Sequence, residues 1–341
     1  MTKILNIAPG AIDKVQETLK SVKNLDKILY VSDPVVNDLY GEKVREQLNC
    51  VARVKEELVD TNTIAYAMSV AERVIATDID CIVGVGGGKV LDVCKYAAFI
   101  AKKPFVSIPT TMANDGIASP IAVLKRQDGM PKSLGCSAPT ILLLDTKLIM
   151  AGPIQLIKAG IGDTISNYMA LKDWTFAVEK GKDQMNGYAY LMSQTAIDVL
   201  MKTQYHSICQ EFMDVLARSL VLSGCAMEYA GSSRPVSGSE HLFSHALDYY
   251  SEKKNLHGIQ VALGTVAVLK LLGDTYKDVL NYLNAFEVDI NPLRLGIDCD
   301  TFVRCMQMAT SMRKDRFTYL NELNLEDERL KKNYNELLEE L

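Results

Sequence analysis

Short hydrophobic runs alternate with amphipathic segments through the first half of the chain. Residues 62–77 and 90–101 have helical spacing, and Thr61 or Asn62 is the expected N-terminal cap of the first helix. Strands and helices that alternate in this way predict a mainly parallel β-sheet with helices between its strands. The runs that resemble buried strands are 27–33 (KILYVSD), 81–85 (CIVGV), 105–108 (FVSI) and 141–144 (ILLL).

From about Gly152 onward the pattern is helical throughout. Gly231 and Gly273 stand where helix C-terminal caps are expected, and residues 326–341 have the pattern of a charged amphipathic helix. We therefore expect an α/β domain over residues 1–152 and an all-α domain over residues 153–341. The helices expected before the last one are 163–180, 187–205, 209–229, 239–251 and 258–272.

Length and composition narrow the class of protein. A chain of 341 residues with 48% hydrophobic residues can form two cores. The net charge of -5 and the lack of a Lys/Arg block argue against nucleic-acid binding. No apolar run approaches the roughly 18 residues that a membrane span needs, and MTKILNIAPG lacks the features of a signal peptide. The eight cysteines form no CxxC pair and mostly have apolar neighbours, which is typical of reduced core residues. We expect a cytoplasmic protein.

A glycine cluster follows the second of the central strands. Gly86, Gly87 and Gly88 lie between that strand and a helix, where backbone N–H groups and a helix N-terminus can contact a diphosphate. The order does not satisfy G-x-G-x-x-G, because Lys89 occupies the last glycine's place. A tight turn without a ligand is the alternative.

Polar residues also follow the neighbouring strands. Asp33 ends one strand, where a carboxylate can accept hydrogen bonds from a ribose 2′-hydroxyl and would repel a 2′-phosphate. It therefore favours NAD over NADP, unless it only caps the turn before Pro34. Thr110, Thr111 and Asp115 lie just past another strand and offer hydroxyls and a carboxylate, although ordinary loops favour the same residue types.

Three of the four histidines lie close together in the sequence. His241 and His245 are four residues apart on a predicted helix and so share a face, and His257 begins the next helix. Asp163, expected at the start of the first helix of the second domain, offers an oxygen ligand. Histidine with carboxylate suits zinc, nickel or ferrous iron better than magnesium or calcium. A capping or core role is the alternative for any one histidine, and we expect it for His206.

Taken together, these motifs resemble the iron-containing alcohol dehydrogenase and dehydroquinate synthase-like superfamily, and within it most closely the glycerol-1-phosphate dehydrogenase branch. The resemblance runs from Asp33 to about Leu272. Its order and spacing are more specific than any single motif, and its richest segments are GVGGGKVLD, IPTTMANDGIASP, AGIGD, SGSEHLFSHALD and LHGIQV. It implies a dinucleotide-binding α/β domain followed by a helical metal- and substrate-binding domain.

The resemblance also implies roles for single residues. Asp163, His241 and His257 would bind one divalent metal, with zinc expected first and nickel or iron as alternatives, whereas His245 would lie near the nicotinamide and substrate as a proton relay. In the first domain, Asp115 would approach the substrate. The residues implied for the cofactor, NAD or alternatively NADP, are Gly86, Gly87, Gly88 and Asp92 at the pyrophosphate, Thr110, Thr111 and Ser119 toward the nicotinamide and substrate, and Asp33 at the adenosine ribose.

The implied reaction interconverts dihydroxyacetone phosphate and sn-glycerol 1-phosphate, so the expected partner is a small polyol phosphate; a homo-oligomer is also expected. Some relatives place a further histidine where this chain has Asn167, a departure that weakens the case for iron and for simple alcohols. The alternatives are a dehydrogenase of unphosphorylated polyols, a dehydroquinate synthase-like lyase, and a non-catalytic nucleotide- or metal-binding module. The candidates to neutralise a substrate phosphate are Lys125, Arg126, Lys132 and Arg234.

Overall fold

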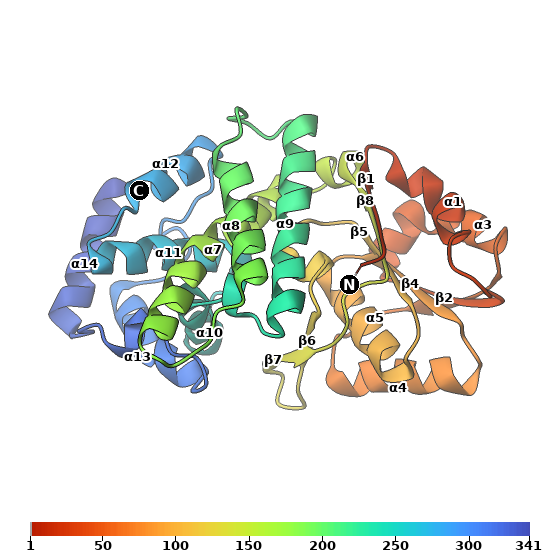
Figure 1. The fold of residues 1–341 in the computed structure, drawn as a ribbon, viewed down its shortest axis with the longest axis horizontal. Coiled ribbons are helices and arrows are strands. Elements are labelled where there is room, and N and C mark those ends of the chain that lie inside the picture. The colour runs from red at the N-terminus through yellow and green to blue at the C-terminus, as the bar shows by residue number, and fades with distance from the viewer. Residues whose placement is uncertain (1) are drawn as a thin grey trace. The chain divides into compact units, whose positions relative to one another are not determined.

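The protein forms two compact units. A computed structural model describes residues 2–341, and the chain divides into Met1–Pro153 and Ile154–Leu341, here called unit 1 and unit 2. Figure 1 shows a sheet with helices in the first and helices alone in the second.

Unit 1 is built on a six-stranded parallel sheet. The strand order is β1-β8-β5-β4-β2-β3, and every pairing in it is parallel. β4 and β5 are buried along their whole length, which explains their continuous apolar sequences. A separate antiparallel hairpin pairs β6 (Ile121–Lys125) with β7 (Pro131–Gly135). The sheet strands are β1 (Ile4–Ala8), β2 (Lys27–Ser32), β3 (Arg53–Leu58), β4 (Cys81–Gly86), β5 (Phe105–Pro109) and β8 (Ile141–Asp145).

Helices connect the strands of this sheet, and a core that includes Tyr30, Val83 and Leu143 packs against it. The N-terminal cap of α4 is Thr63, whose hydroxyl accepts a hydrogen bond from the backbone N–H of Tyr66; the expected caps Thr61 and Asn62 were wrong by one or two positions. The helices of the unit are α1 (Val15–Leu19), α2 (Pro34–Val36), α3 (Glu42–Asn49), α4 (Ile64–Ala76), α5 (Gly88–Ala101) and α6 (Thr146–Met150).

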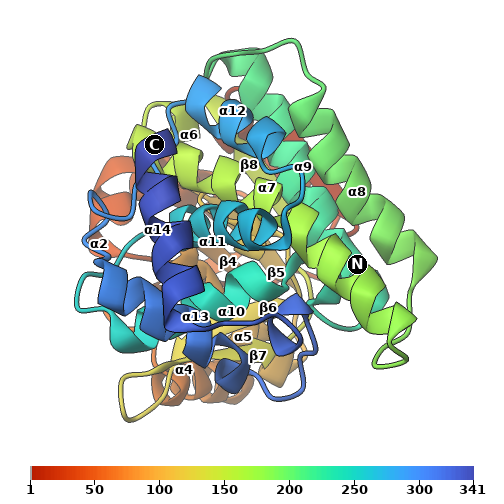
Figure 2. The same cartoon turned by 90° about the vertical axis from the view of Figure 1, so that its left-hand side faces the viewer.

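Unit 2 contains only helices among its described elements. Figure 2 shows α11 near the centre of the unit, and it contacts α7, α10 and α14. Gly231 and Gly273 cap α9 and α11 in the left-handed conformation, as expected. The longer helices are α7 (Ile154–Glu179), α8 (Gly187–Met201), α9 (Gln210–Ala230), α10 (Ser239–Tyr250), α11 (His257–Leu272), α12 (Lys277–Ala285), α13 (Cys299–Met312) and α14 (Asp327–Glu340).

The expectation that Asp163 begins a helix was wrong. α7 starts at Ile154, so Asp163 lies inside it, and Gly160 and Gly162 are helical rather than part of a loop. Close packing explains the glycine at 162, because a Cβ there would lie 2.3 Å from the carbonyl oxygen of Gly258. The glycine that looks like a helix breaker in the sequence instead allows the backbones of α7 and α11 to approach each other.

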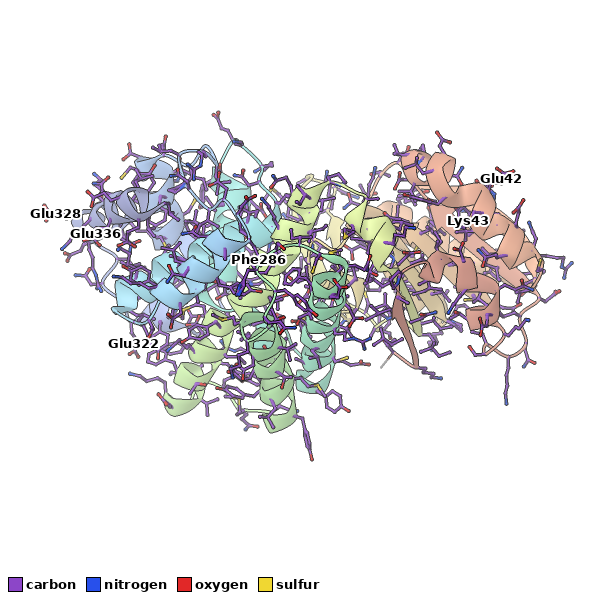
Figure 3. The ribbon with its side chains drawn as sticks, turned by 90° about the horizontal axis from the view of Figure 1, so that it is seen from above. Glu42, Lys43, Phe286, Glu322, Glu328 and Glu336 are labelled. Carbon is purple, nitrogen blue, oxygen red and sulfur yellow. The ribbon has the colours of Figure 1, made fainter. Side chains whose placement is uncertain are left out.

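The C-terminal helix packs on unit 2 through one face. Leu330, Tyr334 and Leu337 of α14 are buried, and the Tyr334 hydroxyl donates to the carbonyl oxygen of Ile297 at 2.9 Å. Figure 3 shows Glu328 extending outward from this helix, while Phe286 lies among the helices, where it stacks on Phe212. The charged amphipathic helix expected from the sequence is therefore a structural part of unit 2.

No helix within residues 2–341 is both long and apolar enough to cross a membrane. All eight cysteines are free thiols, but only Cys81, Cys94 and Cys305 are buried, so the expectation that most are core residues was too broad. The expected fold class, a parallel-sheet domain followed by a helical domain, is confirmed.

Candidate active site

Three of the predicted cofactor residues follow neighbouring strands of the sheet. β5, β4 and β2 are adjacent and parallel, so the segments after them lie at the same edge. Asp33 follows β2, Gly87 follows β4 and Thr110 follows β5. The chain leaves β2 toward β3 on one side and returns to β4 on the other. Such switch points at the carboxyl edge are where open α/β sheets bind ligands.

The glycine cluster packs closely against both flanking segments. A Cβ on Gly86 would lie 3.4 Å from the Asp33 carboxylate and 2.9 Å from the Val90 side chain, and a Cβ on Gly87 would lie 3.4 Å from Oγ1 of Thr111. The backbone N–H of Thr110 donates to the carbonyl oxygen of Gly86 at 3.0 Å. The structure therefore brings the predicted ribose, pyrophosphate and nicotinamide residues together.

Asp33 also forms the turn that the sequence left as an alternative. Its Oδ1 accepts a hydrogen bond from the backbone N–H of Val36 at 3.0 Å and so caps α2. This contact leaves Oδ2, the oxygen nearest to Gly86, on the side of the glycine cluster. The capping role and the ribose role are compatible.

The loop after β5 is supported by a lysine that the sequence analysis did not single out. Lys95 of α5 is 1% exposed, and its ammonium donates to the carbonyl oxygens of Gly116 and Ile121, both at 2.7 Å. It also lies 3.5 Å from the carboxylate of Asp92. Asp92 therefore contacts Lys95 from within α5. The lysine fixes the segment that contains Asp115.

Asp115 itself lies at the start of the short helical turn η3 (Asp115–Ile117), and its carbonyl oxygen accepts a hydrogen bond from the backbone N–H of Ser119 at 3.0 Å. Burial raises the pKa of Asp115 to about 7, and the positive charge of Lys95 opposes this shift. Ser119 is buried, and its hydroxyl donates to the carbonyl oxygen of Ile121 at 3.4 Å.

In unit 2, Asp163, His241 and His257 converge. Ligand atoms of the three side chains all lie within 4.8 Å of one another. Nε2 of His257 is 3.2 Å from Nε2 of His241 and 3.7 Å from Oδ1 of Asp163. The residues come from three helices, α7, α10 and α11, and the glycine contact between α7 and α11 helps to bring two of them together.

Hydrogen bonds from neighbouring residues set the tautomer of both imidazoles. Nδ1 of His241 lies 2.8 Å from Oε1 of Glu240, a buried carboxylate. Nδ1 of His257 lies 3.2 Å from Oγ of Ser244, whose hydroxyl donates to Oε1 of Gln260 at 2.7 Å. Because Glu240 accepts and Ser244 has already donated its proton, both Nδ1 atoms are donors in this network. Each Nε2 then has its lone pair directed toward the other ligand atoms.

This arrangement fits a divalent cation. Burial lowers the pKa of His241 and of His257 to about 3, so both rings are neutral at pH 7 and available as ligands. Two imidazole lone pairs and a buried carboxylate oxygen converge at a partly exposed place, where a metal ion would supply a positive charge. Metal–nitrogen bonds of about 2.0–2.1 Å place adjacent ligand atoms roughly 3.3 Å apart in a tetrahedral site, close to the 3.2 Å between the two Nε2 atoms.

The fourth residue of this cluster, His245, stands apart from the three. Its ring centroid is 6.4 Å from that of His241, one turn further along α10, and the metal-ligand geometry does not include it. His206, for which an ordinary role was expected, is exposed.

The residues proposed to neutralise a substrate phosphate have different surroundings. Lys125 and Lys132 lie on the β6–β7 hairpin, where both are exposed, and Arg126 pairs with Asp128 in the turn. Arg234 is buried and paired with Asp183, and it also donates to the carbonyl oxygen of Phe317 at 2.7 Å. A phosphate role for Arg234 would therefore compete with an existing carboxylate.

Two residues near the site were missed by the sequence analysis. Glu240 precedes His241 directly, and a carboxylate next to a candidate ligand is a signal that could have been used. Lys95 lies three residues after Asp92 in an otherwise apolar stretch of helix, which also could have indicated a buried ion pair.

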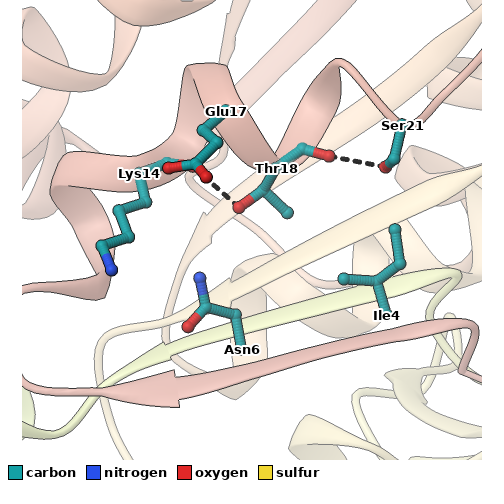
Figure 4. Close-up of a pocket in the computed structure, with 6 residues that line it drawn as sticks. All are labelled: Ile4, Asn6, Lys14, Glu17, Thr18 and Ser21. Carbon is teal, nitrogen blue, oxygen red and sulfur yellow. Dashed lines mark hydrogen bonds between the residues drawn. The ribbon is translucent and has the colours of Figure 1, made fainter.

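A surface pocket of unit 1 is separate from these residues. It has a volume of about 270 Å³ and lies between β1 and the segment that contains α1 (Figure 4). None of the predicted site residues lines it; its lining residues are Ile4, Asn6, Lys14, Glu17, Thr18 and Ser21.

Comparison with known proteins defines the class to which this fold and site belong. Residues 6–153 match the family model described as iron-containing alcohol dehydrogenase. The structure is similar to that of glycerol dehydrogenase from Schizosaccharomyces pombe, with a TM-score of 0.81 and 17% identity, over 99% of this chain and 89% of that one. This likeness confirms the fold.

Sequence relatives define the family more closely. The chain is 34% identical over 322 residues to a glycerol-1-phosphate dehydrogenase [NAD(P)+] of Hyperthermus butylicus, covering 94% of this chain and 92% of the relative. It is 33% identical to the protein of the same description from Thermococcus sibiricus, again over 94% and 92% of the two chains. The chain belongs to the glycerol-1-phosphate dehydrogenase family of the iron-containing alcohol dehydrogenases, and the resemblance expected from its motifs is confirmed.

Proposed function

We propose that the protein is a metal-dependent, NAD(P)-linked dehydrogenase that interconverts dihydroxyacetone phosphate and sn-glycerol 1-phosphate. The observation that supports this most directly is the convergence of Asp163, His241 and His257, with both Nε2 lone pairs directed inward. Membership of a family whose relatives are glycerol-1-phosphate dehydrogenases supplies the substrate.

Each unit supplies a different part of the chemistry. Residues 1–153 would bind the dinucleotide, with the glycine cluster and the N-terminus of α5 at the pyrophosphate and Asp33 at the adenosine ribose. The Asp33 carboxylate disfavours a 2′-phosphate, so we propose NAD as the preferred cofactor, with NADP also accepted. Residues 154–341 would bind the metal and the substrate.

The predicted residues would act on cofactor, metal and substrate as follows. Asp163, His241 and His257 would bind the cation, which when bound polarises the substrate carbonyl as a Lewis acid. Hydride transfer is the chemistry of the nicotinamide. Burial lowers the pKa of His245 to about 3, so its ring is neutral at pH 7. We propose it as the relay that would take up the proton of the substrate hydroxyl during oxidation and return it during reduction. In unit 1, Asp115 would hydrogen-bond the substrate, with Lys95 fixing its loop.

Imidazole and carboxylate ligands suit several transition metals, so we propose zinc first, with nickel and iron as alternatives. Among the described residues, the group of candidate ligands formed by Asp163, His241 and His257 contains no cysteine. A substrate role for Lys125 and a homo-oligomeric state also stay predictions; light scattering measures the second.

The experiment that tests the proposal follows NADH oxidation. Metal-stripped protein is reconstituted separately with zinc, nickel and iron(II), and each form is assayed with dihydroxyacetone phosphate and with dihydroxyacetone. We expect turnover of the phosphorylated substrate that requires metal. A preference for dihydroxyacetone would indicate a polyol dehydrogenase instead. No net NADH consumption with either compound would contradict the proposed reaction and leave the lyase or a non-catalytic module.

A further inference from the structure

Arg316 is a buried cation without an ion-pair partner among the described residues. It is 4% exposed, and its guanidinium donates to the carbonyl oxygen of Ser237 and, at 2.9 Å, to Oγ of Ser233. Both acceptors are neutral. A buried charge that is not paired is costly, so such groups usually have a counter-ion, either in the protein or in a ligand.

A second arginine reaches the same serine. Arg313 donates from Nη1 to Oγ of Ser233 at 3.2 Å, so the two guanidinium groups approach each other at one hydroxyl. Arg313 is about one-third exposed, and its Nη2 lies 2.9 Å from the carboxylate of the exposed Asp315. A third arginine, Arg234, is already neutralised by Asp183.

The nearby carboxylates leave Arg316 without a directly paired partner among the described residues. The carboxylates of Asp183 and Asp315 each pair with one arginine, which leaves Arg316. Burial and, after it, the charges of Arg313 and Arg234 lower the pKa of Arg316 to about 9, so the nearby cations outweigh Asp315 and Glu240 in their effect on it. Glu240 acts on Arg316 through its charge and not through a hydrogen bond: its Oε1 faces His241 and accepts from the backbone N–H of Gly238, and its Oε2 has no hydrogen-bond partner within residues 2–341.

The two arginines lie near the candidate metal ligands. Ser237, which accepts from Arg316, is four residues before His241 at the entry to α10. The charges of Arg316 and Arg313 also act on the imidazoles of His241 and His245, where they add to the lowering of the pKa by burial. All of these residues belong to unit 2.

We propose that Arg313 and Arg316 form the subsite that binds the phosphate group of the substrate. Arg313, the more exposed, would contact the phosphate oxygens directly, and Arg316 would contribute charge and hydrogen bonds from behind it. Guanidinium groups match a phosphate because their N–H donors form parallel, charge-assisted hydrogen bonds. The subsite deepens the proposed function and rests on it, because it explains how the phosphorylated substrate would be distinguished from dihydroxyacetone.

The arginines also connect residues 233–237 to residues 313–317, so a purely structural role is the competing explanation. We compare the metal-loaded forms of the wild-type protein, Arg313→Met and Arg316→Lys to distinguish a phosphate-binding role from a structural role. Arg218→Met is the matched control, since Arg218 pairs with Asp214 on the surface of α9. The readouts are kcat/KM for dihydroxyacetone phosphate and for dihydroxyacetone, and the dissociation constant of inorganic phosphate by calorimetry. Urea unfolding shows whether each variant is folded.

We expect Arg313→Met to lower kcat/KM for dihydroxyacetone phosphate at least about tenfold, the effect of losing a hydrogen bond to a charged group. The value for dihydroxyacetone should stay within about twofold. Arg316→Lys, which keeps the charge but loses the planar fork, should show a smaller loss confined to the phosphorylated substrate. Phosphate should bind Arg313→Met correspondingly more weakly, and Arg218→Met should match wild type.

Equal losses with both substrates in Arg313→Met, or unchanged values for dihydroxyacetone phosphate and inorganic phosphate, would overturn the subsite. If Arg316→Lys does not fold, the Arg313→Met comparison decides alone. If wild-type protein turns over neither substrate, the proposed function fails. Weaker phosphate binding by Arg313→Met would then still support an anion site at the arginines. Unchanged phosphate binding would refute the anion site.

Discussion

Nδ1 of His241 lies 2.8 Å from Oε1 of Glu240, inside unit 2, where the carboxylate is fully buried. The backbone N–H of Gly238 donates to the same oxygen at 2.6 Å and fixes its position. A carboxylate in this place orients the imidazole and increases its basicity toward a metal at Nε2. We therefore predict that Glu240 positions His241 and acts through it on a bound metal.

Replacing Glu240 with Gln should weaken metal binding. The amide keeps the shape of the side chain but removes the negative charge beside Nδ1, and the loss of such a partner costs about 10- to 100-fold in metal affinity. Competition with a chromophoric zinc chelator measures the dissociation constant without reference to activity. Glu322→Gln, which removes a surface partner of Lys180, is the control and should leave the constant unchanged. Equal affinities in Glu240→Gln and wild type would show that the contact does not act on the metal.

Gly88→Ala tests the dinucleotide site. Nothing lies within 4 Å of a Cβ built at Gly88, the first residue of α5, so the folded protein should tolerate alanine and gain up to about 1 kcal/mol of stability. NADH should nevertheless bind about tenfold more weakly, because a Cβ would separate the pyrophosphate from the backbone N–H groups.

The chain offers a matched control for that variant. Gly187 is the first residue of α8, and a Cβ there also meets nothing within 4 Å. Gly187→Ala should change stability in the same direction and leave the NADH dissociation constant as in wild type. Fluorescence titration gives both constants; similar NADH affinity in Gly88→Ala and wild type would place the pyrophosphate elsewhere.

Lys95→Met should destabilise unit 1. The buried ammonium donates to two carbonyl oxygens and pairs with Asp92, and breaking such a buried pair costs about 3–5 kcal/mol because the partner is left without a counter-charge. Lys202→Met, which breaks an exposed pair with Asp198, should cost less than about 1 kcal/mol. Urea unfolding compares the two free energies. A loss below about 1 kcal/mol in Lys95→Met would mean that this buried ion pair contributes little.

Unfolding should become easier as the pH rises from about 4 to 7 because of Asp173. Burial, together with the charge of Glu240, raises the pKa of Asp173 from 3.8 to about 7 in the folded protein. Between these two values the folded state binds more protons than the unfolded state, so the free energy of unfolding falls with pH. For a single group the slope reaches about 1.4 kcal/mol per pH unit.

Asp173→Asn should reduce this slope without abolishing it, since burial also raises the pKa of Glu240 to about 7 with the same sign. The Asp173 carboxylate accepts hydrogen bonds from the backbone N–H groups of Ser239 and Tyr319. An asparagine amide can accept only one of these two hydrogen bonds through its oxygen, so the variant should be less stable at pH 5. Urea unfolding of metal-free protein from pH 5 to 8 measures both slopes. Identical slopes would contradict the raised pKa.

The central strands and the helical second half could be predicted from sequence, because periodicity is a local signal, whereas Asp163, His241 and His257 were implied as metal ligands by the family resemblance. β1 and β3 could not be found in the same way. β3 is an edge strand with the sequence RVKEEL, so its polar composition hides a strand that is paired on one side only. The start of α7 was missed because Gly160 and Gly162 suggest a break unless one knows that α11 packs against Gly162.

Local sequence signals are also insufficient to predict the arrangement of the candidate site. His241, His257 and Asp163 have the right chemistry in the sequence, but only the fold shows that their ligand atoms meet. The contacts of Arg316, like those of Lys95, join residues more than twenty positions apart. Such long-range contacts leave no periodic trace in the chain.

The proposed function depends on a cation bound by one carboxylate and two imidazoles of unit 2. X-ray absorption at the zinc K-edge of zinc-reconstituted protein measures this directly. We predict a first shell of nitrogen and oxygen atoms at about 2.0–2.1 Å from the zinc. The outer-shell scattering should correspond to two imidazoles in the wild-type protein and to one imidazole in His257→Ala. A shell of sulfur at about 2.3 Å, or imidazole scattering unchanged in His257→Ala, would contradict the proposed site.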